Sequence, residues 1–167
     1  MDQGGNVPKR RAVLAAGIGS AVLTAYSIAG ACQTLVWNPL AAVPGATLGE
    51  VYAALDAAGE TLGAPRVIAW GAVGVALAVV GLIGTTLERA PRARHVVTGY
   101  LALLVLAAPS HMFVAFTGGM GIADAFATSG GDHSPWGGML YLASGLALLA
   151  LLALLRTAGW KKGLRSA

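Results

Sequence analysis

The residues VIAWGAVGVALAVVGLIGTT, positions 67–86, decide the fold, because they form a long apolar run without Asp, Glu, Lys or Arg. The hydrocarbon core of a bilayer is about 30 Å thick, and a helix needs about 20 apolar residues to cross it. Three further stretches meet this requirement, at residues 12–37, 96–117 and 136–155. The sequence therefore predicts an all-α integral membrane protein, in which four transmembrane helices form a bundle.

Composition supports this interpretation and excludes an ordinary soluble domain. Of the 167 residues, 56% are hydrophobic and 11% are charged, and the mean hydropathy is +0.71. A typical soluble domain has about 25% charged residues. Four spans and two longer loops account for the whole chain, so we expect a single domain over residues 1–167.

The basic residues indicate how the chain is threaded. All but one of the Lys and Arg residues lie before the first span, in the loop 87–95, or after the fourth span; the exception is Arg66. Lys and Arg are enriched in cytoplasmic loops, which predicts cytoplasmic termini and external loops at 38–66 and 118–135. Richness in Ala, Gly, Val and Arg favours a bacterial source, and hence the plasma (inner) membrane. Basic clusters beside spans bind lipid headgroups, so we expect membrane lipids as partners and do not expect nucleic acid.

The N-terminus also has features of a secretory signal. Lys9, Arg10 and Arg11 precede an apolar stretch that contains an Ala-x-Ala sequence before Cys32. The apolar stretch is longer than the usual 7–15 residues of a signal peptide. We therefore expect an uncleaved first span, with cleavage before Cys32 as the alternative. A single cysteine allows no disulfide within the chain.

The loop 38–66 contains a helix signature. Thr47 and Glu50 have the spacing of a capping box, and apolar residues follow at helical intervals. We predict an amphipathic helix from Leu48 to Leu62, ended by Gly63, that lies on the external end of the bundle, on the headgroup layer or against another protein. The two prolines and the glycine of residues 38–46 predict an extended or turned segment. The loop 118–135 is predicted to hold one or two helical turns between glycines.

Small residues predict where the spans pack. In lipid, helices associate through close contacts that small side chains allow. Two rows of small residues recur every three or four positions, one on the second span and one on the first: Gly71, Gly74, Ala78 and Gly81, and Gly17, Ala21, Ala25 and Ala29. We expect these rows to meet each other or to flank the centre of the bundle. The alternative is that one row binds a second copy or another subunit.

Catalytic signatures are scarce in this sequence. No span has an acidic or basic residue near its middle, which argues against a proton-coupled transporter. The sequence has no Cys-x-x-Cys, no His-Glu-x-x-His and no Gly-x-Ser-x-Gly motif. We therefore expect a protein that is not an enzyme, with a membrane enzyme acting on lipid or quinone as a minor alternative.

His111 is the polar residue that stands out within a span. Pro109 removes a backbone donor and is expected to kink the third span, where Ser110 and His111 can restore hydrogen bonds. One interpretation is a neutral imidazole that faces inward and bonds Ser27, Tyr26 or Gln33. The alternative is a soft metal site, since imidazole and thioether ligands favour Cu(I). Its candidate ligands lie toward the external end, with Cys32 nearby: His111, Met112, Met120, His133 and Met139.

These observations predict a non-enzymatic membrane component. The leading hypothesis is an accessory or scaffold subunit of a larger membrane assembly, or a bundle that self-associates, without a cofactor. The alternative is a protein that handles copper or conducts a small solute through the His/Met cluster.

Overall fold

The computed structural model describes residues 6–163, with side chains over residues 7–157. Every regular element in this part of the chain is helical. The elements are α1 (Asn6–Cys32), the π-helical turn η1 (Gln33–Trp37), α2 (Asn38–Ala42), α3 (Leu48–Ala57), α4 (Ala64–Leu87), α5 (Ala93–Phe126) and α6 (Pro135–Gly163). Four helical segments are long and apolar enough to cross a membrane, which confirms the predicted all-helical class: Val7–Ala42, Ala64–Leu87, Ala93–Phe126 and Pro135–Thr157.

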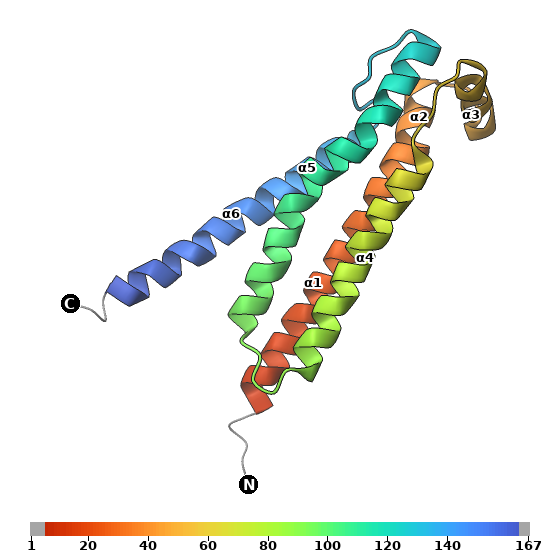
Figure 1. Cartoon of the computed structure of the whole chain (residues 1–167). Coiled ribbons are helices and arrows are strands. Elements are labelled where there is room, and N and C mark those ends of the chain that lie inside the picture. Colours follow the sequence, from red (N-terminus) through yellow and green to blue (C-terminus); the bar gives the residue numbers. More distant parts are fainter. Residues whose placement is uncertain (1–5, 164–167) are drawn as a thin grey trace.

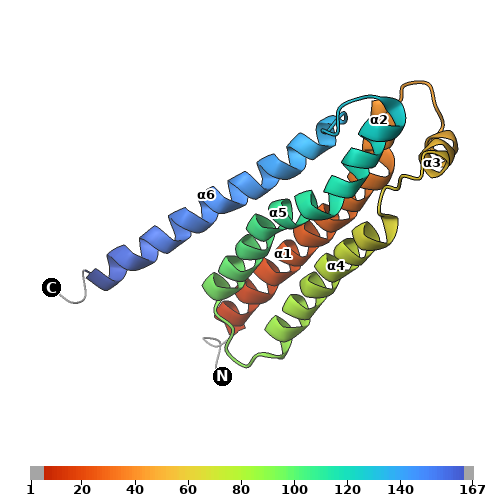
Figure 2. The ribbon, with the colours of Figure 1, turned by 45° about the horizontal axis from the view of Figure 1, so that its top comes forward.

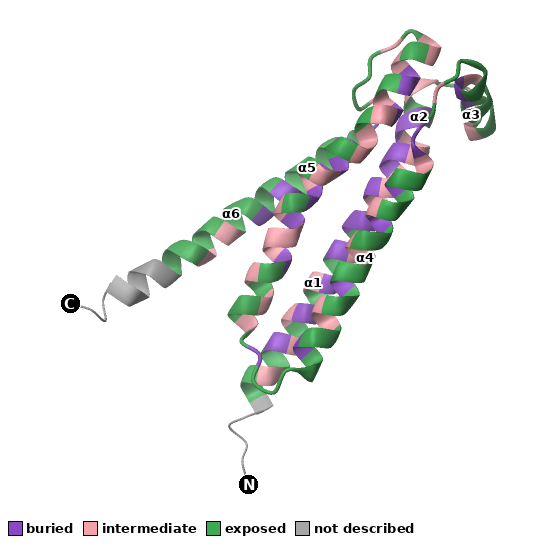
Figure 3. Ribbon diagram, viewed as in Figure 1, coloured by how far each residue is buried: buried purple, intermediate pink, exposed green. Residues whose placement is uncertain are grey.

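The long helices form an elongated bundle. α1, α4 and α5 lie side by side, and α6 packs along α5 and moves away from α1 toward its own C-terminus (Figures 1 and 2). Buried residues follow the lines where α1 faces α4 and α5, whereas the outer faces of α4 and α6 are largely exposed (Figure 3). The central core therefore lies among α1, α4 and α5, and α6 contributes Leu140 and Ala147 to it from one edge.

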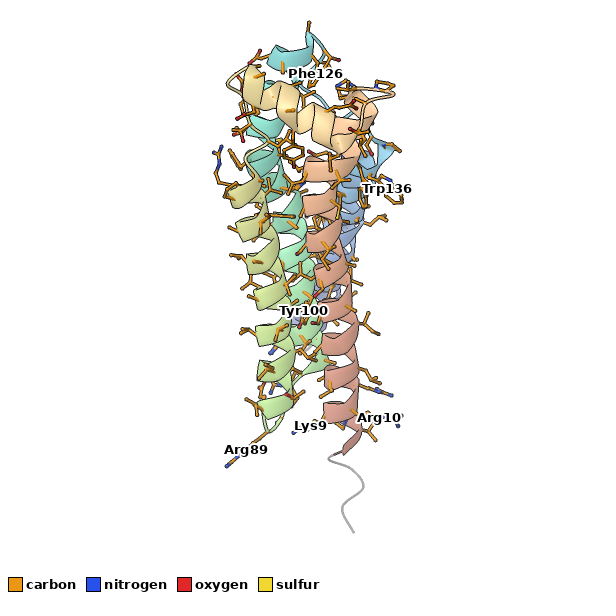
Figure 4. The ribbon with its side chains drawn as sticks, turned by 90° about the vertical axis from the view of Figure 1, so that its right-hand side faces the viewer. Lys9, Arg10, Arg89, Tyr100, Phe126 and Trp136 are labelled. Carbon is orange, nitrogen blue, oxygen red and sulfur yellow. The ribbon has the colours of Figure 1, made fainter. Side chains whose placement is uncertain are left out.

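The two ends of the bundle differ in charge and structure. Lys9, Arg10 and Arg89 lie at one end, which we call the basic end (Figure 4). α2, α3 and the loop of residues 127–134 lie at the opposite end, which we call the α3 end. The predicted basic positions Lys161, Lys162 and Arg165 lie outside the described side chains.

The first helical path is longer than predicted. We expected residues 38–46 to be extended, but η1 and α2 continue the path of α1 to Ala42. Pro39 lies in the first turn of α2 and has no backbone N–H, so it cannot donate to the preceding turn. In an α-helix the carbonyl of Leu35 would pair with residue 39; here the Tyr52 hydroxyl of α3 donates to that carbonyl at 3.2 Å. The proline is therefore accommodated by a π turn and a side chain.

The loop predicted at residues 118–135 is also partly helical, because α5 continues to Phe126. Its glycines permit close approach, whereas we had interpreted them as signs of a loop. A Cβ added to Gly118 would lie 3.2 Å from the Leu62 carbonyl oxygen, and one added to Gly121 would lie 2.9 Å from that of Thr61. The segment leading into α4 therefore packs directly on the backbone of α5.

α3 has the predicted start and an earlier end. The capping box of Thr47 and Glu50 is present, but the helix ends at Ala57, so its predicted end at Leu62 is wrong. The chain turns at Gly59, which has a φ of +74°, a conformation that glycine adopts without strain. Val51 and Leu55 of α3 and Ile122 of α5 are buried in one cluster with Leu62, which therefore packs from outside the helix.

The predicted packing rows have different surroundings. Gly71 and Gly74 of α4 face Ser27 of α1, and Gly81 faces the Tyr100 ring of α5. Ala78 is fully buried, and its carbonyl accepts a hydrogen bond from the Tyr100 hydroxyl at 2.9 Å. The α4 row thus lies in contact with two neighbouring helices.

The α1 row is divided: Ala29 packs against the core cluster that contains Ala78, whereas Gly17, Ala21 and Ala25 lie outside this contact. The expected meeting of the two rows is therefore not seen at these three positions. A Cβ added to Gly17 would have no neighbour within 4 Å, and Ala21 and Ala25 are exposed. The face of α1 that packs inward is a different set: Ala12, Ala16, Ser20, Leu23 and Ser27.

Gly74→Ala tests the contact between α4 and α1. The added methyl would overlap the Ser27 side chain, so we expect a loss of about 1 to 3 kcal/mol in the free energy of unfolding. Gly84→Ala on the same helix is the matched control, because a Cβ there has no neighbour within 4 Å and the change should stabilise by up to about 1 kcal/mol. Unfolding in mixed detergent micelles measures both. Equal effects would contradict the importance of this contact.

Glu50 gives a pH prediction for the start of α3. The Thr47 amide and hydroxyl donate to the Glu50 carboxylate at 2.7 and 2.8 Å, and the amide is the main reason that the pKa of Glu50 is lowered. A carboxyl with a lowered pKa stabilises the fold above its unfolded value and loses this effect as the pH falls through its folded value. We expect the first turn of α3 to loosen below about pH 4.

The NMR shift of the Thr47 amide would report this transition. In Glu50→Gln, which retains the cap but cannot titrate, the amide should not move over the same range. A wild-type amide that fails to titrate would contradict the prediction.

Candidate functional site

His111 lies inside the bundle toward the α3 end, where it connects α5 to α1. Its side chain is 2% exposed, and Nε2 lies 3.0 Å from the Gly30 carbonyl oxygen and 3.1 Å from Thr34 Oγ1. Because a carbonyl oxygen only accepts, the contact with Gly30 assigns the proton to Nε2. The Thr34 hydroxyl also donates to the Gly30 carbonyl, at 3.2 Å. The imidazole is therefore held by two groups of one helical turn.

His111 contacts a hydroxyl, as expected, but the hydroxyl belongs to Thr34, which was not among the expected partners. Ser27 donates to the Leu23 carbonyl, the Tyr26 hydroxyl pairs with the Ser144 hydroxyl, and Gln33 donates to Asp132. Each of the three expected partners thus bonds elsewhere. Thr34 meets His111 at the start of the π turn, which sequence periodicity does not reveal.

Pro109 and Ser110 connect α5 to α4. α5 changes direction along its length (Figures 1 and 2), and Pro109 lies inside it. The Ser110 hydroxyl donates to the Ala107 carbonyl and accepts from Trp70 Nε1, each at 3.0 Å. The Trp70 ring also lies 5.1 Å from the His111 ring, centroid to centroid. The kinked segment is therefore fixed to two neighbouring helices.

Two amide side chains attach the loop of residues 127–134 to the first helical path. Gln33 is 1% exposed, and its Nε2 donates to Asp132 Oδ1 at 3.1 Å. Asn38 Oδ1 accepts from the backbone amides of His133 and Ser134, at 2.6 and 3.3 Å. Within the described part of the chain, Gln33 Oε1 is buried and has no hydrogen-bond partner. The loop is thereby closed over η1 and α2.

A cavity of about 150 Å³ lies between this loop, η1, α2, α5 and α6. We call it the Asp132 cavity. Glycine backbones of α5 and of the loop form part of its wall. Its side chains combine one carboxylate with polar, aromatic and thioether groups, namely Asp132, Thr34, Asn38, Tyr141, Phe116 and Met112.

The predicted soft-metal ligands occupy different environments. His111 is buried and hydrogen-bonded, whereas Met112, Met120 and Met139 are all exposed surface side chains. Nε2 of His133 lies 2.9 Å from the Ser129 carbonyl oxygen, so it is also engaged. In the described part of the chain, no group of three or more His, Cys, Asp or Glu side chains could hold a metal ion.

Sequence reasoning missed most of the polar groups that meet at this end. Gln33, Thr34 and Asn38 interrupt the last turns of an apolar stretch, and that interruption was the available signal. Comparison with protein-family models, with curated proteins and with solved structures finds no match for this chain. Its function therefore has to be inferred from these side chains and from the surfaces of the bundle.

His111→Leu tests the connection between α5 and α1. Removing a buried hydrogen-bonding group should lower the free energy of unfolding by about 1 to 2 kcal/mol. His95→Leu is the matched control, since His95 lies on the same helix and is exposed. Denaturation in mixed micelles compares the two variants. A loss no greater for His111→Leu than for the control would contradict a structural role of the imidazole.

Proposed function

We propose that this chain is a non-enzymatic membrane component that self-associates through the outer face of α1. The observation that carries the proposal is the row of small residues at Gly17, Ala21 and Ala25, which the fold leaves uncovered. We call this row the α1 ridge. Exposed aliphatic side chains flank it, namely Leu14, Ile18, Val22 and Ile28.

The lipid surroundings explain why small residues on the α1 ridge would favour association. Lipid tails are as apolar as leucine, so apolar area alone does not drive helices together in a membrane. Small residues spaced by four let two backbones approach closely, and dispersion contacts then stabilise the pair. Copies of one protein share an orientation in the membrane, so two α1 helices would pack in parallel about a two-fold axis. The ridge suits that arrangement because it is the same surface on both copies.

The use of the polar groups supports a structural role. His111, Ser110 and Asn38 each hold two segments together through the hydrogen bonds described above. Acid–base catalysis requires groups that can reach a substrate proton, and these side chains are engaged with the protein itself. This supports a structural component that acts through helix packing and does not catalyse a reaction.

The proposal includes an orientation in the plasma membrane of a bacterium. Lys9, Arg10 and Arg89 mark one end of the bundle (Figure 4). The carboxylates of Asp132, in the loop of residues 127–134, and of Glu50 and Asp56, on α3, belong to the opposite end. The bias of basic residues toward cytoplasmic loops supports a cytoplasmic basic end and an external α3 end.

Replacement of a ridge residue tests the proposal. Ala21→Leu should weaken self-association at least about fivefold, because overpacking costs about 1 to 3 kcal/mol. Ala150→Leu on α6 is the matched control, since Ala150 is also exposed but lies off the ridge. Native mass spectrometry of the full chain released gently from membranes measures the dimer fraction.

Three results are informative. A dimer that Ala21→Leu disrupts and Ala150→Leu retains supports the proposal. A stoichiometric different subunit lost in Ala21→Leu would replace self-association by an accessory role through the same ridge. A monomer in the wild type, or equal behaviour of the two variants, would overturn the proposal.

A further inference from the structure

We infer that the Asp132 cavity binds an organic ammonium group at the α3 end of the bundle. This site is separate from the α1 ridge, and the inference does not rest on the proposed self-association. The cavity of about 150 Å³ is equivalent to about five water molecules at about 30 Å³ each, which is room for a small headgroup rather than a whole lipid.

The charge of the cavity comes from a carboxylate that the protein holds in place. Gln33, which is almost fully buried, donates to Asp132 Oδ1 at 3.1 Å. The same carboxylate lies against Gly137 in the first turn of α6. A site whose charged group is already oriented loses little conformational freedom when a ligand binds. The carboxylate therefore favours a cation and disfavours an anion.

Hydrogen-bond capacity points the same way. The Asp132 carboxylate offers acceptor positions beyond the one that Gln33 occupies, and the Thr34 hydroxyl, which also lines the cavity, can accept as well. A primary ammonium carries three donors and no acceptor, so it matches a place where acceptors are in excess. Charge-assisted hydrogen bonds of this kind are roughly twice as strong as neutral ones.

The other walls suit an organic cation better than a metal ion. Phe116 and Tyr141 line the cavity and are 67% and 41% exposed, so the fold does not cover these aromatic side chains. Aromatic faces attract alkylammonium groups, and the Met112 side chain adds a polarizable apolar surface. A hard metal ion requires six or more oxygen ligands, usually with several carboxylates, and only one carboxylate lines this cavity.

Depth in the membrane suggests two sources of the ammonium. A helix rises about 1.5 Å per residue, so a hydrocarbon core of about 30 Å that begins at Ala12 ends near Cys32. η1 and the cavity would then lie at the level of the headgroups. The ligand is either the amino headgroup of a lipid such as phosphatidylethanolamine or a free amine from the surrounding water.

Lipid retention by the full chain tests the inference. Native mass spectrometry would compare phosphatidylethanolamine with its N-acetylated form, which keeps the phosphate but lacks the ammonium charge. Phosphatidylglycerol, which has a phosphate and no amine, is the second comparison. We expect about tenfold preferential retention of the charged amine and its loss in Asp132→Asn. Asp124→Asn is the matched control, because Asp124 is an exposed carboxylate at the same end that does not line the cavity.

A second variant keeps the test decisive if Asp132→Asn fails to fold. Phe116→Leu preserves the carboxylate and the apolar bulk but removes the ring, so binding should weaken about two- to fivefold. Ethanolamine added in solution identifies the source: displacement of the lipid at millimolar concentration indicates a free amine, and resistance to it indicates a lipid.

The inference fails under three outcomes. The N-acetylated lipid could be retained equally well, or the preference could survive in Asp132→Asn. Calcium could also bind in an Asp132-dependent manner while no amine does, which would assign the cavity to an inorganic cation.

Discussion

A helix surrounded by hydrocarbon has no water with which to pair its polar side chains, and this constraint organises the bundle. The polar residues within the helices therefore find partners on neighbouring helices. His111 bonds the Gly30 carbonyl of α1, Tyr100 bonds the Ala78 carbonyl of α4, and Ser144 of α6 bonds the Leu104 carbonyl. All three bonds involve α5, so α5 connects the other long helices. Such hydrogen bonds contribute about 1 kcal/mol each in membranes, and they also specify which faces meet.

The small residues complement these hydrogen bonds. Gly74 and Gly121 lie where a side chain would collide with Ser27 or with the Thr61 backbone, so they set the distance between neighbouring segments. Close approach in turn makes the hydrogen bonds reachable, since Tyr100 packs over Gly81 while its hydroxyl meets Ala78. Packing and polar pairing therefore depend on each other along α4 and α5.

The sequence was informative about the number of long helices and about the cap of α3. Hydropathy is a property of each segment, and a capping box is local, so both can be recognised without tertiary contacts. The face of α1 that packs inward could not be recognised. Ala12 and Ala16 are buried, whereas Ala21 and Ala25 are exposed, although both pairs have the same four-residue spacing. The spacing of small residues identifies a surface suited to close packing, but it does not identify what packs against that surface.

The ends of the elements were predicted less well for a related reason. Pro39 normally suggests a helix break, yet a π turn and the Tyr52 hydroxyl of α3 accommodate it here. Gly118 suggests a loop, yet it admits the Leu62 backbone against α5. In both cases the deciding partner is distant in sequence. The polar cluster around Asp132 could not be predicted for the same reason, because its partner Gln33 lies 99 positions away in the sequence.

The α1 ridge and the Asp132 cavity share one helical path. α1 carries the ridge, and its continuation through η1 and α2 places Thr34 and Asn38 in the cavity wall. A rotation of α1 that accompanied association would therefore shift that wall relative to Asp132. A ligand that fixes the wall would oppose the same rotation, because coupling between two sites is reciprocal.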